Sequence, residues 1–125
     1  MTEREQFLSD IIVCAIEGGI GYWSTTLHYC AEGRMVVQGW PAVAEPRTET
    51  TWAIVEDIDT GQVFTITPSV IEQGIARILN SEVSYPPFAV DALDLADASN
   101  DAGLIDATTA DDIVQAALLG AIVYG

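Results

Sequence analysis

Hydrophobic residues recur at three- and four-residue spacing near the start of the chain, and this pattern predicts a helix over residues 3–17. The apolar stripe consists of Phe7, Leu8, Ile11, Ile12 and Ala15. Such spacing places these side chains on one face of a helix. Thr2 followed by Glu5 is a capping-box pattern at the helix start, and Gly18-Gly19 ends the helix.

The middle of the chain predicts a β-hairpin. Residues 50–57 are mostly apolar or β-branched and are typical of a strand, and residues 62–67 form the returning strand. Asp59-Thr60-Gly61 lies between them as a turn in which Gly61 can take a positive φ. Apolar residues alternate onto both sides of the first strand, so we expect both of its faces to be at least partly covered.

The segments before the hairpin have a weaker pattern. Residues 20–30 are aromatic and β-branched, which fits a strand or a short helix, and we favour the strand. We expect a turn at residues 31–34, a short strand at residues 35–40 and an exposed loop at residues 42–49.

Three helices are predicted after the hairpin. Thr67-Pro68 opens the first, with Thr as the N-cap and Pro at the first helical position. Its apolar face consists of Val70, Ile71, Ile75, Ile78 and Leu79. Residues 88–99 form the second, and Thr108-Thr109 before two aspartates predicts a last helix over residues 110–119. We therefore expect one α+β domain over residues 1–125, with a small antiparallel sheet around the hairpin (about 50–67) packed by about four helices.

Charge narrows the range of partners. The chain carries 4 basic residues, all of them arginine, against 19 acidic ones, and its formal net charge is -15. Such a chain cannot neutralise phosphates, so we expect no direct binding of nucleic acid and no binding to an anionic membrane. No basic signal peptide or long apolar run is present, and we expect a cytoplasmic protein. Basic proteins and cations remain as partners.

The acids are concentrated late in the chain, because residues 78–125 contain no lysine or arginine. At about 100° per residue, four aspartates near the predicted second helix fall within roughly 120° of one another. They are Asp91, Asp94, Asp97 and Asp101. The apolar residues Phe88, Ala92, Leu93, Leu95 and Ala96 fall on the other side, where we expect them to be buried.

This acidic stripe has two interpretations. Unneutralised like charges three or four residues apart destabilise a helix, which favours a functional reason for them, namely binding a basic partner. Acidic surfaces also arise from solubility or a salt-rich habitat, so a merely solvated face is the alternative. The sequence leaves both open.

Catalytic patterns are lacking in the sequence. His28 is the only histidine and has no nucleophile arranged beside it in sequence, and Asp57-Ile58-Asp59 is better explained as part of the hairpin turn than as a calcium loop. Cys14 and Cys30 indicate two reduced, buried thiols, with a disulfide or redox role as the alternative. We expect no enzyme activity, no catalytic residue, no metal site and no cofactor.

Residues 15–23 and 110–125 resemble small uncharacterised acidic proteins of actinobacteria, their phages and their plasmids. This resemblance implies a mobile-element setting, in which small acidic proteins are often inhibitors of host defence nucleases. It implies no functional residue.

Three hypotheses for function follow. The first is a non-enzymatic inhibitor or nucleic-acid mimic, of an anti-restriction or anti-CRISPR kind, that uses the acidic stripe to block a basic nucleic-acid-binding protein. The second is an accessory or assembly protein, including a homodimer, that associates through exposed aromatic residues such as Trp23, Trp40 or Tyr85. The third is an enzyme with an unrecognised site. It would need a deep pocket near Glu17, Tyr22, His28 or Tyr29.

Overall fold

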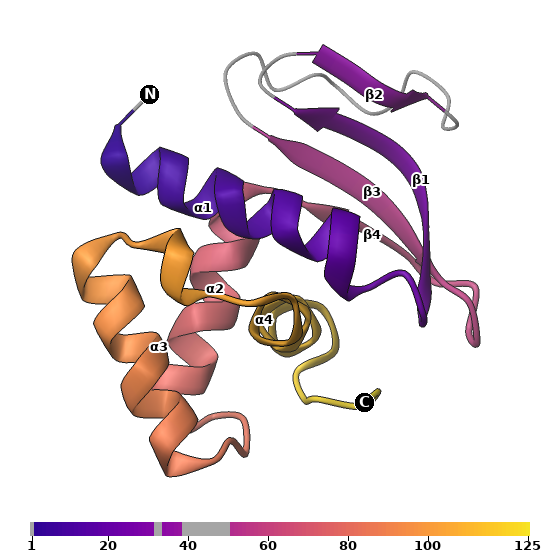
Figure 1. Cartoon of the computed structure of the whole chain (residues 1–125). Helices are drawn as coiled ribbons and strands as arrows, with labels where there is room; N and C mark the ends of the chain where they lie inside the picture. The colour runs from indigo at the N-terminus through magenta and orange to yellow at the C-terminus, as the bar shows by residue number, and fades with distance from the viewer. Residues whose placement is uncertain (1, 32–33, 39–50) are drawn as a thin grey trace.

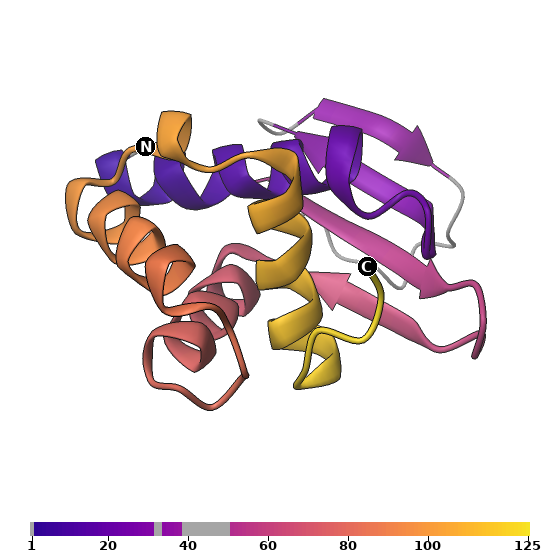
Figure 2. The same ribbon diagram turned by 60° about the horizontal axis from the view of Figure 1, so that its bottom comes forward.

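The computed structural model of the chain describes residues 2–31, 34–38 and 51–125, with the backbone alone for residues 34–38. Within these residues the fold is α+β: a four-stranded antiparallel sheet with helices gathered on one face (Figure 1). The predicted fold class is confirmed. Figures 1 and 2 both place the sheet at one end of the molecule and helix α3 at the opposite end.

The first helix forms as the periodicity predicts. Helix α1 (Glu3–Cys14) begins with a complete capping box, in which the Thr2 hydroxyl accepts from the Glu5 amide and the Glu5 carboxylate accepts from the Thr2 amide. The chain continues into a π-helical turn, η1 (Ala15–Gly19), where the Ile20 amide donates to the Ala15 carbonyl at 2.9 Å. The predicted end at residue 17 therefore falls inside this wider turn.

The sheet has the strand order β2-β1-β3-β4. Its strands are β1 (Ser24–Ala31), β2 (Arg34–Gln38), β3 (Trp52–Asp57) and β4 (Val63–Ile66). The predicted hairpin is confirmed as β3–β4, with Ala53 paired to Ile66 and Glu56 to Val63. Gly61 in the turn has a φ of 73°, a conformation that favours glycine.

The strand interpretation of residues 20–30 is confirmed from Ser24 onward, and the short strand predicted at residues 35–40 is present as β2. Of the turn predicted at residues 31–34, Ala31 ends β1 and Arg34 begins β2. Residues 32–33, residues 39–40 and the predicted exposed loop at 42–49 lie outside the described residues.

Three helices follow the sheet. Helix α2 (Pro68–Leu79) starts as predicted, with the Val70 amide donating to the Thr67 hydroxyl at 3.3 Å. Helix α3 (Pro87–Ser99) is followed by a short 3-10 turn, η2 (Ala102–Leu104). Helix α4 (Ala107–Leu119) begins earlier than the predicted residue 110, because Asp106 is its N-cap and accepts from the Thr109 amide at 2.7 Å.

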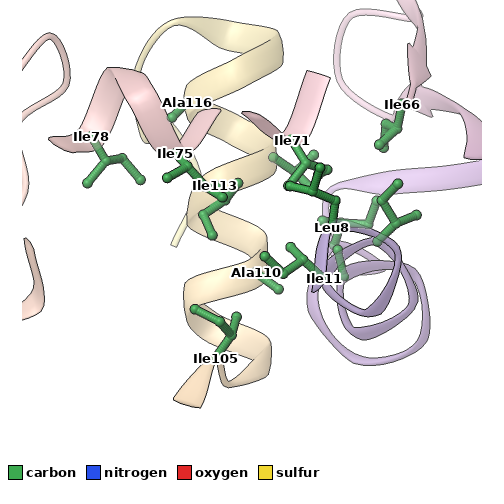
Figure 3. Packing of buried hydrophobic residues seen from close by; sticks show 14 of the residues in the cluster. Leu8, Ile11, Ile66, Ile71, Ile75, Ile78, Ile105, Ala110, Ile113 and Ala116 are labelled. Carbon is green, nitrogen blue, oxygen red and sulfur yellow. The ribbon is translucent and has the colours of Figure 1, made fainter. Parts of the chain in front are cut away.

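The main core lies between the helices and the inner face of the sheet. Figure 3 shows how isoleucines from α2 and α4 meet Leu8 and Ile11 of α1 and Ile66 of β4. The outer face of the sheet carries a second, smaller cluster of buried residues, namely Cys30, Trp52 and Ile54. Both faces of β3 are therefore covered, as the sequence predicts.

Candidate functional site

Helix α3 presents an outward face on which acidic and apolar side chains lie side by side. Leu93 and Ala96 are buried and hold the helix on the protein. Asp91 and Asp94 are exposed on the opposite side, one helical turn apart. Phe88 and Leu95 are 79% and 62% exposed on the same outward side, next to the aspartates. We call these four residues, Phe88, Asp91, Asp94 and Leu95, the α3 surface.

The sequence-based assignment of faces on this helix needs correction. Phe88, Ala92 and Leu95 were expected in the core, but all three are exposed. The physical reason is the position of α3 at the end of the molecule away from the sheet, where α2 and η2 are its main neighbours. A helix with so few neighbours buries only a narrow stripe.

Asp97 is not a free charge. Its carboxylate accepts from Nη2 of Arg4 at 2.6 Å, and its backbone carbonyl accepts from Nη1 of Arg4 at 3.0 Å. The same guanidinium donates to the Glu72 carboxylate from Nε at 3.0 Å and also from Nη2, and to the Asn100 side chain at 2.9 Å. Hydrogen bonding to Glu72, and then to Asp97, holds the pKa of Arg4 above its usual value. Asp97 thus belongs to an ionic network that ties α1 to α2 and α3.

Asp101 lies beyond the helix. Asn100 takes a left-handed conformation, with a φ of 52°, and ends α3. The Asp101 side chain then accepts from the Gly103 amide at 2.9 Å and caps η2. Of the four aspartates predicted to form one unneutralised stripe, only Asp91 and Asp94 stand as exposed helical neighbours without a cation among the described side chains.

The basic residues reinforce this charge imbalance. Nη1 of Arg77 donates to the backbone carbonyls of Ala116 and Ala117, both at 2.8 Å, near the C-terminal end of α4. A cation at this end also offsets the helix dipole. Arg4 and Arg77 are the two basic residues whose side chains the structure describes, and both are engaged within the protein. The described surface therefore offers acidic groups with no free arginine among them.

A hollow of about 350 Å³ lies elsewhere, where η1 faces the start of α4. Tyr22, Asp111 and Asp112 line it. The Asp111 carboxylate accepts from the Tyr22 hydroxyl at 2.6 Å, from the Trp23 indole at 2.8 Å and from the Gln115 amide at 2.9 Å. Both of its oxygens are thus occupied by donors that fix the fold, and burial together with Asp111 raises the pKa of Tyr22 to about 12.

Asp112 in the same hollow accepts from the Tyr85 hydroxyl at 2.8 Å. Burial, followed by the neighbouring Asp111 and Asp106, raises the pKa of Asp112. The other residues named for a possible enzyme site are not gathered here. His28 is buried on the outer face of the sheet against Trp52, at 4.8 Å between ring centroids, whereas Tyr29 lies in the main core. The enzyme hypothesis therefore gains a hollow with Tyr22 but no nucleophile and base placed together among the described residues.

The remaining candidate residues have structural places. The Asp57 carboxylate accepts from the Asp59 amide at 2.8 Å and from the Tyr124 hydroxyl at 2.9 Å, so it shapes the hairpin turn. Cys14 and Cys30 are free thiols in different clusters. Within residues 2–31 and 51–125 no three His, Cys, Asp or Glu side chains lie together as metal ligands.

Trp23 and Tyr85, two of the aromatic residues named for apolar association, are described by the structure, and neither is exposed. Trp23 is 3% exposed and stacks on Tyr124 at 5.3 Å between ring centroids, which corrects its expected place on the surface. Tyr85 is half-buried against α4, and Trp40 lies outside the described residues. Sequence reasoning missed the exposed Phe88, whose position beside Pro86-Pro87 at the helix start was the available signal.

Comparisons with known proteins supply no relative: no protein-family model, curated protein or solved structure matches the chain. The resemblance at residues 15–23 and 110–125 therefore adds no residue to the site. None of the helices in the described part of the chain is long and apolar enough to cross a bilayer.

Proposed function

We propose that the protein is a non-enzymatic binding protein that blocks a basic surface on another protein, and that the α3 surface is the contact. The observation that carries this proposal is the combination of exposed Asp91 and Asp94 with exposed Phe88 and Leu95 on one helix face. Interfaces commonly join a desolvated apolar or aromatic centre to a polar rim that sets specificity.

The charge of the whole chain supports a basic partner. A formal charge of -15 attracts a basic partner over several ångströms and speeds encounter, and exposed acids close to the contact suppress acidic competitors. The carboxylates of Asp91 and Asp94 are separated by about 4.5 Å along the helix axis, a loose match to phosphates on a nucleic-acid strand. We therefore propose a nucleic-acid-binding protein as the partner class, with the acids in place of phosphates.

The test is affinity capture from a lysate with low-salt and then high-salt washes. The test variant is Asp91→Asn with Asp94→Asn, which removes two charges from the α3 surface. Asp97 and Asp101 are left intact, because they bind Arg4 and cap η2. The matched control is Asp10→Asn with Asp59→Asn, which removes two charges from exposed positions on α1 and in the hairpin turn.

We expect the wild type to retain a nucleic-acid-binding protein. High salt and the Asp91→Asn/Asp94→Asn variant should each abolish this retention, and the control pair should not. Equal retention of the partner by the two double variants would mean that Asp91 and Asp94 matter no more than two acids elsewhere, and it would contradict the assigned surface. Loss of the partner on addition of competing DNA or RNA would further support the mimic.

The second candidate is an accessory or assembly protein that associates through apolar contacts. Phe88, Leu95 and Leu104 favour it, because all three are at least half exposed. Binding that survives high salt and the Asp91→Asn/Asp94→Asn variant, but not Phe88→Ala, would select this candidate.

A further inference from the structure

An apolar groove runs beside the α3 surface. It lies between α3 and the segment that joins η2 to α4, and its volume is about 230 Å³. Phe88, Ala92 and Leu93 line one side, and Leu104, Ile105 and Asp106 line the other. Leu93 and Ile105 are almost completely buried at 1% and 7% exposure, whereas Phe88 and Leu104 stand at 79% and 50%. The groove thus has a buried base and two exposed apolar walls.

The backbone around the groove restricts what can occupy it. The amides of Leu104 and Ile105 donate to the carbonyls of Asp101 and Ala102, and the Thr109 amide donates to Asp106. Neither wall is a β-strand, because one is helix α3 and the other is η2 with the short segment before α4, so the groove has no strand edge for an extended peptide to pair with. An occupant must therefore satisfy its own backbone, and a helix that inserts apolar side chains does so.

Charge restricts the occupant further. Asp106 lies at the groove itself, and Asp91 and Asp94 lie on the outward face of the helix that forms one wall. A second copy of this chain would bring a further net charge of -15 and no lysine. Repulsion between like charges therefore opposes self-association here. A helix with basic residues flanking its apolar stripe complements both the groove and its acids.

We propose that this groove binds an amphipathic basic α-helix of the partner protein, with one or two apolar side chains inserted between Phe88 and Leu104. The proposal rests on the proposed function and deepens it, because it gives the recognised element of the basic partner. Insertion of one leucine into such a groove is expected to strengthen binding about tenfold over charge attraction alone.

The probe is a synthetic peptide of about 18 residues, enough for five helical turns, with leucines along one face and lysines on the others. Its partner probe has the same composition in an order that spreads the leucines around the helix. Binding of both labelled peptides to the full chain is measured by fluorescence anisotropy. Ala92→Trp fills the groove and Leu104→Ala removes a wall, while Ala76→Trp on the exposed side of α2 is the matched control. Circular dichroism verifies that each variant is folded.

The expected result is that the patterned peptide binds about tenfold more tightly than the scrambled one. Ala92→Trp and Leu104→Ala should abolish this preference, and Ala76→Trp should preserve it. Equal binding of the two peptides, weakened by Asp91→Asn/Asp94→Asn, would overturn the groove while leaving the acidic contact standing. A preference that depends on Ala92 but ignores both aspartates would keep the groove and contradict the acidic contact. If neither peptide binds, the proposal that the groove binds a helix is also overturned.

Discussion

Helix α2 crosses α4 at Gly74, where a single added methyl group meets the backbone of the other helix. A Cβ atom at position 74 would lie 2.2 Å from the carbonyl oxygen of Ile113 and 3.1 Å from Cβ of Ala117. An unstrained contact between carbon and oxygen needs about 3.3 Å. Gly74→Ala must therefore push the two helices apart by about 1 Å.

Two effects of opposite sign decide the outcome. Alanine is a better helix former than glycine, and this alone would stabilise the protein by about 1 kcal/mol. Separation of the helices loosens packing between Ile75 of α2 and Ile113 and Ala116 of α4, which meet in the core (Figure 3). Overpacking of this kind, including the backbone shift that it forces, costs about 1–3 kcal/mol, and a gap of 0.5–1 Å forfeits about a quarter to a half of each dispersion contact. Because the clash is with main-chain oxygen, we expect a packing loss at the upper end of this range, about 3 kcal/mol. Subtracting the gain in propensity leaves a net loss of about 2 kcal/mol.

The assay is urea unfolding followed by far-UV circular dichroism, together with thermal unfolding. A loss of that size should lower Tm by about 6–10 °C in a chain of this length. Ala76→Gly, at an exposed position on the same helix, is the control for propensity and should cost about 1 kcal/mol. If Gly74→Ala proves as stable as the wild type or more stable, the reasoning about the crossing is refuted.

Three further predictions concern ionisable side chains. Arg4→Met breaks the partly buried ion pairs of α1 with α2 and α3. It should lower the free energy of unfolding by about 2 kcal/mol, a value between those of exposed and buried ion pairs. An unchanged free energy of unfolding in urea would contradict the network. Asp112 has a raised pKa because of burial, so its ionised form opposes folding at neutral pH and Asp112→Asn should stabilise the protein at pH 7, with the gain vanishing below about pH 4. The pKa of Tyr22 is raised to about 12, mainly by burial, and that of Tyr124 to about 12, mainly by its hydrogen bond to a carboxylate. Both raised pKa values favour the folded state below the usual tyrosine pKa of about 10. The free energy of unfolding should therefore fall as pH rises from about 10 towards 12, and it should fall less steeply in the Tyr22→Phe/Tyr124→Phe variant.

Local signals in the sequence were sufficient for most elements. The capping box at Thr2, the turn glycine at Gly61 and the Thr67-Pro68 helix start each act over a few residues, and each is present in the structure. The start of α4 was displaced because Asp106 caps it in place of the threonines. An aspartate or a threonine can each cap the orphan amides at a helix start, and sequence alone does not rank the two positions.

The candidate site was less predictable, because it depends on contacts between distant parts of the chain. Arg4 pairs with Asp97 across 93 positions, so nothing near Asp97 in sequence shows that its charge is neutralised. Helix α3 carries apolar residues around most of its circumference, and only its position beside α2 decides that Leu93 is buried and Leu95 is not. The existence of the helix follows from the sequence, whereas its exposed face follows from tertiary packing.

The hydrogen bonds of Gln115 constrain substitution at position 115 far more than at position 123. Its fully buried side-chain amide accepts from the backbone amides of Val123 and Tyr124, both at 2.8 Å, and donates to the Tyr124 carbonyl at 3.0 Å. The partners in these hydrogen bonds are main-chain atoms, and every residue except proline has both the amide N–H and the carbonyl oxygen. Position 123 can therefore diverge freely among homologues, while position 115 can accept only a side chain that both donates and accepts at the same reach. An alignment of homologues should show a nearly fixed residue at 115 opposite a variable one at 123.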